Sequence, residues 1–272
     1  MLLDLICLLF GGGLTATGLL TFWKINYWWD FYRPIVLFIG GYVFGVAMLF
    51  PIEWLAGRFV NHKKEYDHVS KWAKFWLMQG TSFITRHAHI IVKSTGLNKV
   101  PKKEKFVVYC NHRSKFDNFV ITNKIGKLDV AFITKRSNSK VFIVKDIIPG
   151  LCYIPIDRED KLQSLEAFKR ASTLLETGAT SIGVFPEGTR QQEKVIGDFH
   201  EGTFNIAIHS KAPIVITTLT NTEKVRKHWP LGFTKVRFDV LAVIRYEEYE
   251  GMTAKAISDM AHEMMANHLQ EI

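Results

Sequence analysis

Apolar residues dominate the beginning of the chain in two long runs. The first run, residues 2–23, contains a single charged residue, Asp4. The second run, residues 34–56, is interrupted by Pro51 and Glu53. Each is close to the ~20 residues that an α-helix needs to cross the hydrocarbon core of a bilayer. The pattern therefore predicts two membrane-embedded helices before any soluble domain begins.

The segment between the two runs, residues 24–33, favours a hairpin. It contains two Trp, two Tyr and one Phe, and such rings are enriched where membrane meets water. A signal peptide is the alternative for the first run, but that run lacks a basic start and the second run follows too soon. We therefore predict that residues 1–57 form a membrane-anchoring helical hairpin, which either crosses the bilayer or enters one leaflet.

Basic residues are concentrated directly after the predicted hairpin. The chain has a formal net charge of +9, and residues 58–105 contain eleven Lys and Arg against three acidic residues. A basic side chain near anionic headgroups contributes about 1 kcal/mol, so this segment fits a membrane surface. Nucleic acid is the alternative partner, but no recognisable nucleic-acid module accompanies the charge, and none is expected to bind. The positive-inside rule then predicts a cytoplasmic position for the domain that follows.

Residues 58–272 alternate strand-like and helix-like patterns. Short runs rich in β-branched and aromatic residues predict strands at residues 90–93, 106–110, 130–134, 152–156, 181–185, 213–219 and 236–244. Helical spacing predicts helices at residues 67–88, 119–124, 160–178, 206–208 and near the C-terminus. Residues 58–272 are therefore expected to form one α/β domain with a central mixed sheet flanked by helices.

Three of these helices have a predicted apolar face. Residues 67–88 place apolar side chains between lysines, which predicts an amphipathic helix at the membrane surface, with burial in the domain core as the alternative. The face expected for the helix capped by Asp160 consists of Leu162, Leu165, Phe168, Leu174 and Leu175. The face expected for the last helix consists of Ile257, Met260, Ala261, Met264 and Met265.

Histidine and cysteine spacing gives no sign of a metal site or a disulfide framework. His87 and His89 stand two residues apart, which predicts one face of a strand, but no third ligand lies nearby in the sequence. We expect them to be ordinary polar residues and expect no bound metal. The cysteines Cys7, Cys110 and Cys152 all lie in apolar runs, which is typical of a reducing, cytoplasm-facing domain.

The strongest candidate chemistry lies between the strand at residues 106–110 and the helix that follows. His112 and Asp117 stand at this junction, where helix N–H groups have no internal partner. Their spacing lets the chain double back so that the carboxylate meets the imidazole. A carboxylate on one ring nitrogen fixes the tautomer and leaves the other nitrogen free to take a proton.

A second block with chemistry follows another predicted strand. It consists of Phe185, Pro186, Glu187, Gly188, Thr189 and Arg190. Before it come Asn111, His112, Ser114 and Asp117 in one block and Arg158 at the end of another, and after it comes a hydrophobic block with Pro213. This order of four blocks resembles the glycerolipid acyltransferase family, whose best-known members make phosphatidate from lysophosphatidate.

The resemblance implies a membrane-bound O-acyltransferase that acts on the sn-2 hydroxyl of 1-acylglycerol 3-phosphate. Acyl-CoA or acyl carrier protein would be the donor substrate, and no further cofactor is expected. His112 would be the general base and Asp117 would orient it. The residues implied to bind the acceptor are Arg158, Glu187, Gly188, Thr189 and Arg190. Without the resemblance, Glu187 and Arg190 would be interpreted as a local surface ion pair.

Two residues are candidates for a nucleophile that would carry the acyl group in an acyl-enzyme, which is the alternative to direct transfer. Ser114 lies within the first block, although a serine near a helix start is by default an N-cap. Cys110 precedes the block, and a Cys–His pair can form an acyl-enzyme. Because buried cysteines are usually inert, we expect the acceptor hydroxyl itself to attack.

Two departures from the family pattern leave the acceptor open. Arg113 stands where phosphatidate-forming members often carry Gln, and an Arg there resembles enzymes that acylate glycerol 3-phosphate. The fourth block lacks a second proline after Pro213. Glycerol 3-phosphate or another lysophospholipid is therefore an alternative acceptor. A lipid-surface binding protein without turnover is the alternative from another functional class.

Overall fold

The sheet forms the centre of the domain and contains parallel and antiparallel strand pairs. The computed structural model describes residues 1–272 except 63, 137–144, 158–159, 192–195 and 272. Seven strands lie in the order β1-β7-β6-β2-β5-β3-β4. Their bounds are β1 Ile90–Thr95, β2 Val107–Cys110, β3 Val130–Lys135, β4 Ile154–Ile156, β5 Ser181–Val184, β6 Ile214–Thr220 and β7 Thr234–Ile244. All neighbours pair in parallel except β6 and β7, so the predicted mixed sheet is confirmed.

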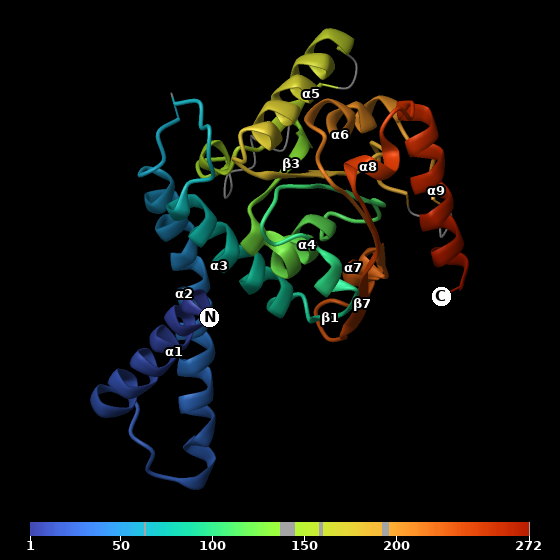
Figure 1. The fold of residues 1–272 in the computed structure, drawn as a ribbon. Helices are drawn as coiled ribbons and strands as arrows, with labels where there is room; N and C mark the ends of the chain where they lie inside the picture. The colour runs from blue at the N-terminus through green and yellow to red at the C-terminus, as the bar shows by residue number, and fades with distance from the viewer. Residues whose placement is uncertain (63, 137–144, 158–159, 192–195, 272) are drawn as a thin grey trace.

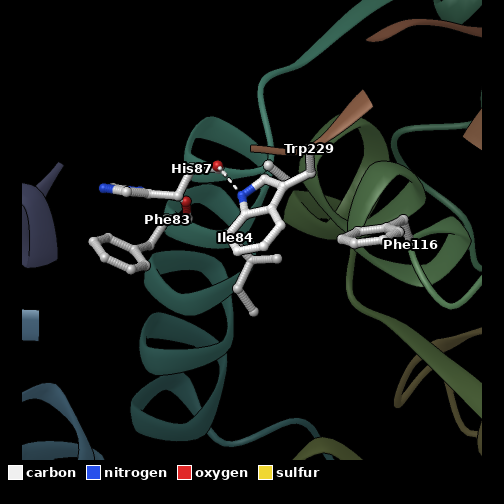
Figure 2. Close-up of a pocket in the computed structure, with 6 residues that line it drawn as sticks. Phe83, Ile84, His87, Phe116 and Trp229 are labelled. Carbon is white, nitrogen blue, oxygen red and sulfur yellow. Dashed lines mark hydrogen bonds between the residues drawn. The ribbon is translucent and has the colours of Figure 1, made fainter. Parts of the chain in front are cut away.

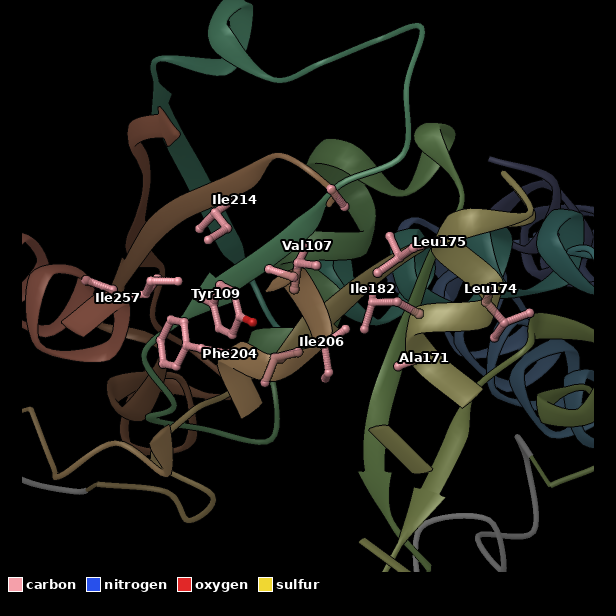
Figure 3. Packing of buried hydrophobic residues seen from close by; sticks show 14 of the residues in the cluster. Val107, Tyr109, Ala171, Leu174, Leu175, Ile182, Phe204, Ile206, Ile214 and Ile257 are labelled. Carbon is pink, nitrogen blue, oxygen red and sulfur yellow. The ribbon is translucent and has the colours of Figure 1, made fainter. Parts of the chain in front are cut away.

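Helices cover both faces of this sheet (Figure 1). One face packs against α5 (Lys161–Glu176), α6 (Asn205–Ser210), α8 (Tyr246–Tyr249) and α9 (Ala254–Glu271). The other face packs against α4 (Asp117–Ile125) and α7 (Val225–His228). Figure 3 shows the first of these cores, in which Val107, Ile182 and Ile214 of the three central strands meet Leu174, Leu175 and Ile257 of the helices. The central strand β2 is buried along its whole length.

The two N-terminal apolar runs form helices that project from the domain (Figure 1). These are α1 (Leu2–Thr21) and α2 (Tyr32–Gly57), joined through a short 3₁₀ turn at Trp28–Phe31. Both are long and apolar enough to cross a membrane, and only 22% and 17% of their most apolar windows are buried. The helices touch closely because a Cβ at Gly41 would meet the Phe10 carbonyl and one at Gly45 would meet Cys7. Their exposed apolar surface distinguishes them from core helices of a soluble domain.

Helix α3 (Lys71–His87) connects the hairpin to the domain. It begins at Lys71 because the Ser70 side chain accepts a hydrogen bond from the Ala73 N–H. Ala73 and Trp76 are buried against hairpin residues, whereas Trp72 and Phe75 are 42% exposed each. The predicted amphipathic helix is therefore confirmed, and its buried stripe packs against the hairpin. Its predicted position at a membrane surface stays a prediction.

The strand predicted to hold His87 and His89 on one face is wrong. His87 is the last residue of α3, and His89 has a left-handed backbone with φ 52°. The His87 ring lies 2.5 Å from the Tyr42 hydroxyl and bonds the Phe83 carbonyl at 2.9 Å. Within the part of the chain that the structure describes, no group of three His, Cys, Asp or Glu residues is placed to hold a metal ion.

Helix α5 begins as predicted but turns a different face to the core. The Asp160 side chain accepts hydrogen bonds from the Leu162 and Gln163 N–H groups, each at 3.0 Å. Leu162 and Leu165 are nevertheless 73% and 52% exposed, and the buried side is formed by Ala167, Ala171, Leu174 and Leu175. The first two leucines were therefore wrongly placed, because small alanines make the close contact with the sheet. The predicted strand at 152–156 is also shorter, since Cys152 has φ 57°.

Candidate active site

The two motif blocks meet because β2 and β5 are parallel neighbours that end at the same edge of the sheet. Tyr109 of β2 lies in register with Val184 of β5. His112 follows two residues after β2, and Glu187 follows three residues after β5. The carboxyl ends of parallel strands are where open α/β sheets carry their sites. Segments that are 75 residues apart in sequence are thereby brought into direct contact.

Asn111 fixes the turn that leaves β2. Its side-chain amide donates to the Leu219 carbonyl at 3.0 Å, and its side-chain oxygen accepts from the Leu219 N–H at 2.7 Å. Asn111 therefore pairs with the backbone of β6 as a strand residue would, although the chain has already left the sheet. A buried side chain that satisfies both partners in this way rigidifies the adjoining backbone. These two bonds fix the backbone directly before His112.

Asp117 collects three hydrogen bonds on one buried oxygen. It is the first residue of α4, and its side chain is 0% exposed. Its Oδ2 accepts from His112 Nδ1 at 2.7 Å, from the Arg113 N–H at 2.7 Å and from the Ser114 N–H at 2.8 Å. The short turn thus brings the carboxylate to the ring, as expected from the spacing. Hydrogen bonds to an ionised acceptor are shorter and stronger than neutral ones.

The His112 ring is held on two sides and open on a third. Nδ1 is bonded to Asp117, and the ring stacks on Phe185 with 4.2 Å between the centroids. The side chain is 17% exposed, and Nε2 has no hydrogen-bond partner among the residues that the structure describes. Because Asp117 accepts at Nδ1, the neutral ring carries its proton there and its lone pair at Nε2. This geometry suits a general base.

Glu187 clamps the two motif loops together from the inside. Its side chain is 4% exposed. Oε1 accepts from the His112 N–H at 2.7 Å and Oε2 accepts from the Gly197 N–H at 3.1 Å. Burial raises the pKa of Glu187 to about 7, while the two backbone donors favour its charged form. The Gln191 N–H donates to the His112 carbonyl at 2.8 Å. The loop after β5 therefore bonds both the N–H and the carbonyl of His112.

The end of the second block lies on the surface, whereas Pro186 and Gly188 are buried. Gly188 has φ 69°, which reverses the chain at little steric cost. Thr189 and Arg190 follow and are exposed. Glu187 points inward, so the surface ion pair with Arg190 considered from the sequence is not seen among the described residues. Arg190 has no ion pair in that part of the chain and presents a free guanidinium. Arg158 lies outside the described residues.

Arg113 forms an ion pair with Glu223. Its Nε donates to Glu223 Oε2 at 3.1 Å, and its Nη2 lies 3.5 Å from the other carboxylate oxygen. The Arg113 side chain is 5% exposed and that of Glu223 is 21% exposed. A nearly buried pair of this kind is kept because breaking it would leave a buried charge without a counterion. Arg113 therefore joins the turn after β2 to the segment after β6.

The two competing nucleophiles are poorly placed. Cys110 is 1% exposed at the end of β2, and burial raises the pKa of its thiol well above the ordinary value. A thiol that stays protonated is a weak nucleophile. The Ser114 hydroxyl accepts from the Phe116 N–H at 3.2 Å, so it supports the turn that leads into α4. Neither geometry favours an acyl-enzyme.

Several residues at the site were not identified from the sequence alone. Phe185 has no role of its own in the sequence analysis, yet its ring stacks on His112. Glu223 is not singled out there either, yet its carboxylate pairs with Arg113. Gly197 donates to Glu187 from a segment without predicted structure. Contacts of this kind depend on which loops meet in space, and no local pattern in the sequence encodes them.

Comparison with known proteins identifies the domain that holds this site. Residues 91–219 match the family model described as Acyltransferase. A chloroplastic 1-acyl-sn-glycerol-3-phosphate acyltransferase of Brassica napus is 27% identical over 212 residues, covering 78% of this chain and 58% of the relative. Its counterpart in Arabidopsis thaliana is 26% identical over 212 residues, covering 78% and 56%. This chain therefore spans less than three fifths of the length of these two relatives.

A solved structure shares the fold over almost the whole chain. The crystal structure of the 1-acyl-sn-glycerophosphate acyltransferase from Thermotoga maritima covers 98% of this chain and 95% of its own, with a TM-score of 0.62 and 19% identity. At that identity the likeness establishes the fold, including a mixed sheet flanked by helices with two apolar helices before it. Residues 91–219, which contain both motif blocks, match the acyltransferase family model, and the relatives that are similar to this part of the chain are acyltransferases.

Proposed function

We propose that this protein is a membrane-bound O-acyltransferase that makes phosphatidate for phospholipid biosynthesis. It would move an acyl chain from acyl-CoA or acyl carrier protein to the sn-2 hydroxyl of 1-acylglycerol 3-phosphate. The observation that carries the proposal is the open Nε2 of His112, whose ring is held by the buried Asp117 carboxylate. Arg190 follows β5 at the same edge of the sheet and has no ion pair within the described residues. The activity of the relatives in Brassica napus and Arabidopsis thaliana supports the same reaction class.

The proposed step is a direct transfer. His112 Nε2 takes the proton from the acceptor hydroxyl as its oxygen attacks the thioester carbonyl. The new C–O bond forms, the carbonyl becomes a tetrahedral oxyanion, and the C–S bond then breaks. The proton on His112 passes to the departing thiolate, so the enzyme returns to its starting state. Asp117 stabilises the transient imidazolium, and no metal or further cofactor enters the step.

Acceptor binding is assigned to the second block. The planar guanidinium of Arg190 suits a phosphate monoester because its fork of donors matches two phosphate oxygens. Gly188 and Thr189 lie beside it and offer close backbone approach. Glu187 acts here by holding the backbone of both loops, since its carboxylate already accepts two N–H groups. Arg158 is kept as a further phosphate ligand on the strength of the family resemblance.

The pairing of Arg113 bears on the two acceptors considered from the sequence. An Arg at this position resembles enzymes that acylate glycerol 3-phosphate, and it would have to offer its charge to the substrate in order to bind the phosphate. Its guanidinium is instead paired with Glu223 and almost fully buried. Within the described residues Arg190 of the second block has no ion pair, and this block resembles that of enzymes with a lysophosphatidate acceptor, which supports lysophosphatidate.

The geometry of the hairpin supports a position in one leaflet, and the basic residues after it support a cytoplasmic position for the domain. Tyr42 contacts His87 at the end of α3, so the domain begins about ten residues above the start of α2 at Tyr32. At 1.5 Å per residue the free part of α2 is about 15 Å long. That length equals about half of a ~30 Å hydrocarbon core. Full crossing would place the polar end of α3 in the middle of the bilayer.

The test is a competition between acceptors. Purified protein is reconstituted into vesicles that contain lysophosphatidate, with glycerol 3-phosphate at equal concentration in the buffer, and acyl-CoA or acyl carrier protein is supplied. Mass spectrometry is expected to find phosphatidate acylated at sn-2. Acylation of glycerol 3-phosphate alone would replace the acceptor assignment. Absence of any acylated product would favour the lipid-binding protein.

A further inference from the structure

The turn between α7 and β7 carries three large apolar side chains that are each more than half exposed. Trp229, Leu231 and Phe233 are 58%, 92% and 65% exposed. Leu231 is the most exposed large apolar side chain in the described part of the chain. Apolar residues gathered in this way on an otherwise polar surface mark an interaction site. Residues 229–233 are called the docking turn below.

The docking turn is held in place by the end of α3. Trp229 Nε1 donates to the His87 carbonyl at 3.1 Å, and the Phe233 ring stacks on His89 with 5.0 Å between centroids. Figure 2 shows the indole of Trp229 between α3 and Phe116, where these residues line an open apolar pocket of about 260 Å³. The two aromatic side chains are therefore anchored from behind. Leu231, between them, makes the outermost contact.

Basic residues flank the docking turn on both sides. Lys224, Arg226 and Lys227 come before it and Lys235 follows it, and all four are exposed. The acidic residues nearby are already used, since Glu223 pairs with Arg113 and Asp239 pairs with Arg237. These four basic residues have no ion pair within the described part of the chain. Tryptophan beside such lysines and arginines is the composition that binds an anionic membrane interface.

The height of the docking turn relative to the hairpin agrees with such a contact. Trp229 bonds the backbone of His87, whose ring lies 2.5 Å from the Tyr42 hydroxyl. The turn is thus linked to the level of α2 that stands about 15 Å above Tyr32. With the hairpin in one leaflet, this level coincides with the headgroups. Figure 1 shows the hairpin and the tip before β7 toward the same lower end of the molecule.

We propose that the docking turn is a second bilayer contact, which inserts Leu231 among anionic headgroups and fixes the tilt of the domain. This inference rests on the membrane attachment proposed above. The turn is coupled to the site at two points: Phe116, in its pocket, precedes Asp117, and Glu223, shortly before α7, holds Arg113. A hairpin alone leaves the domain free to swing about one attachment. Two attachments hold the His112 edge of the sheet at a constant height above the lipid.

The insertion is tested with single environment-sensitive labels on the full-length protein. The native cysteines Cys7, Cys110 and Cys152 are all buried, so an introduced cysteine is labelled selectively. The positions are Leu231→Cys in the turn, Leu20→Cys in the hairpin and Leu162→Cys on α5 as an exposed control. After reconstitution into vesicles that contain phosphatidylglycerol, lipids with a nitroxide near the headgroup are expected to quench the label at 231. Lipids with a nitroxide deep in the acyl chain are expected to quench the label at 20, and neither lipid is expected to quench the label at 162.

The label pattern separates this inference from the anchor on which it rests. Quenching at 20 but not at 231 would overturn the docking turn and leave the anchor standing. No quenching at either position would overturn both. A 231 label that is quenched equally in neutral and anionic vesicles would overturn the role given to the basic residues. None of these readouts requires the acyl transfer reaction.

Activity supplies the second readout. Leu231→Glu is expected to reduce the rate on vesicle-embedded acceptor about tenfold relative to the rate on a short-chain, monodisperse acceptor. Leu162→Glu, an equally drastic change at an exposed leucine, is expected to leave this ratio unchanged. An unchanged ratio in Leu231→Glu would contradict the proposal.

Discussion

Replacing Asp117 by asparagine tests the most buried polar contact of the site with the smallest change in shape. The amide oxygen can occupy the place of Oδ2 and still accept from His112, Arg113 and Ser114. The amide nitrogen then occupies the place of Oδ1, which is buried and has no hydrogen-bond partner within the described structure. The turn is thus preserved, while the negative charge behind His112 is removed.

The expected loss of rate depends on how much more the Asp117 charge stabilises the transition state than the resting enzyme. In the resting enzyme the lost charge weakens three hydrogen bonds by about 1 kcal/mol each. This loss is offset because a carboxylate no longer has to be buried, which costs several kcal/mol. In the transition state His112 becomes an imidazolium whose Nδ1 lies 2.7 Å from Asp117 Oδ2. Because each charge is spread over its group, the two charges are centred roughly 4 Å apart. Two unit charges at that distance attract by about 4 kcal/mol at an effective dielectric constant near 20, which corresponds to a factor of about 10³ in rate.

The assay measures kcat and KM for phosphatidate formation together with the thermal midpoint in detergent. For Asp117→Asn, kcat is expected to fall by about 10²–10⁴-fold, with KM for the acceptor changed by less than about threefold. Asp129→Asn is the matched control, because Asp129 is a 30% exposed ion-pair partner of Lys74 and Lys105 outside the site. Its φ of 58° suits asparagine. A loss below about tenfold in a folded Asp117→Asn protein would refute the imidazolium argument.

Three further predictions concern the thiol, the clamp and the hairpin. Cys110→Ser is expected to retain most activity because the thiol is buried and its pKa is raised; an inactive but folded variant would indicate an acyl-cysteine. The pKa of Glu187 is about 7 in the folded protein, against an ordinary 4.5. Between these two pH values the folded state binds a proton that the unfolded state has released. The free energy of unfolding therefore falls as pH rises through this range, by roughly 3 kcal/mol in total. Glu187→Gln should flatten the fall of the thermal midpoint between pH 5 and 7, and an unchanged slope would exclude Glu187 as its source. Finally, detergent but not 1 M salt should release the protein from membranes, since salt screens charges and leaves apolar burial intact; release by salt alone would rule out the hairpin anchor.

The sequence contained enough to predict the elements and the central turn. Strand β2, the helix after it and the cap at Asp160 each depend on local patterns of a few residues, and all three occur close to the predicted positions. The approach of Asp117 to His112 is also local, since five residues separate them. Chemistry that is built within one turn can be inferred from spacing.

The remaining features depend on packing between distant segments. Leu162 and Leu165 fit an apolar helical face, but Ala167 and Ala171 allow α5 to approach the sheet and so decide which face is buried. Glu187 has the residue type of a surface ion-pair partner, yet the parallel pairing of β2 and β5 turns it toward the backbone of His112. The docking turn contains too few residues to show periodicity. Its significance lies in its distance from the hairpin, which only the fold supplies.

The most direct measurement of the central claim is the stoichiometry of thiol release and phosphatidate formation in the wild-type protein and in His112→Ala. The claim is that His112 removes the proton from the acceptor hydroxyl for direct attack on the thioester. It predicts one thiol released per phosphatidate formed, no thiol release without lysophosphatidate, and a loss of about 10²–10⁴-fold in both rates for His112→Ala. Thiol release at the full rate without acceptor, or phosphatidate formation that survives in His112→Ala, would contradict it.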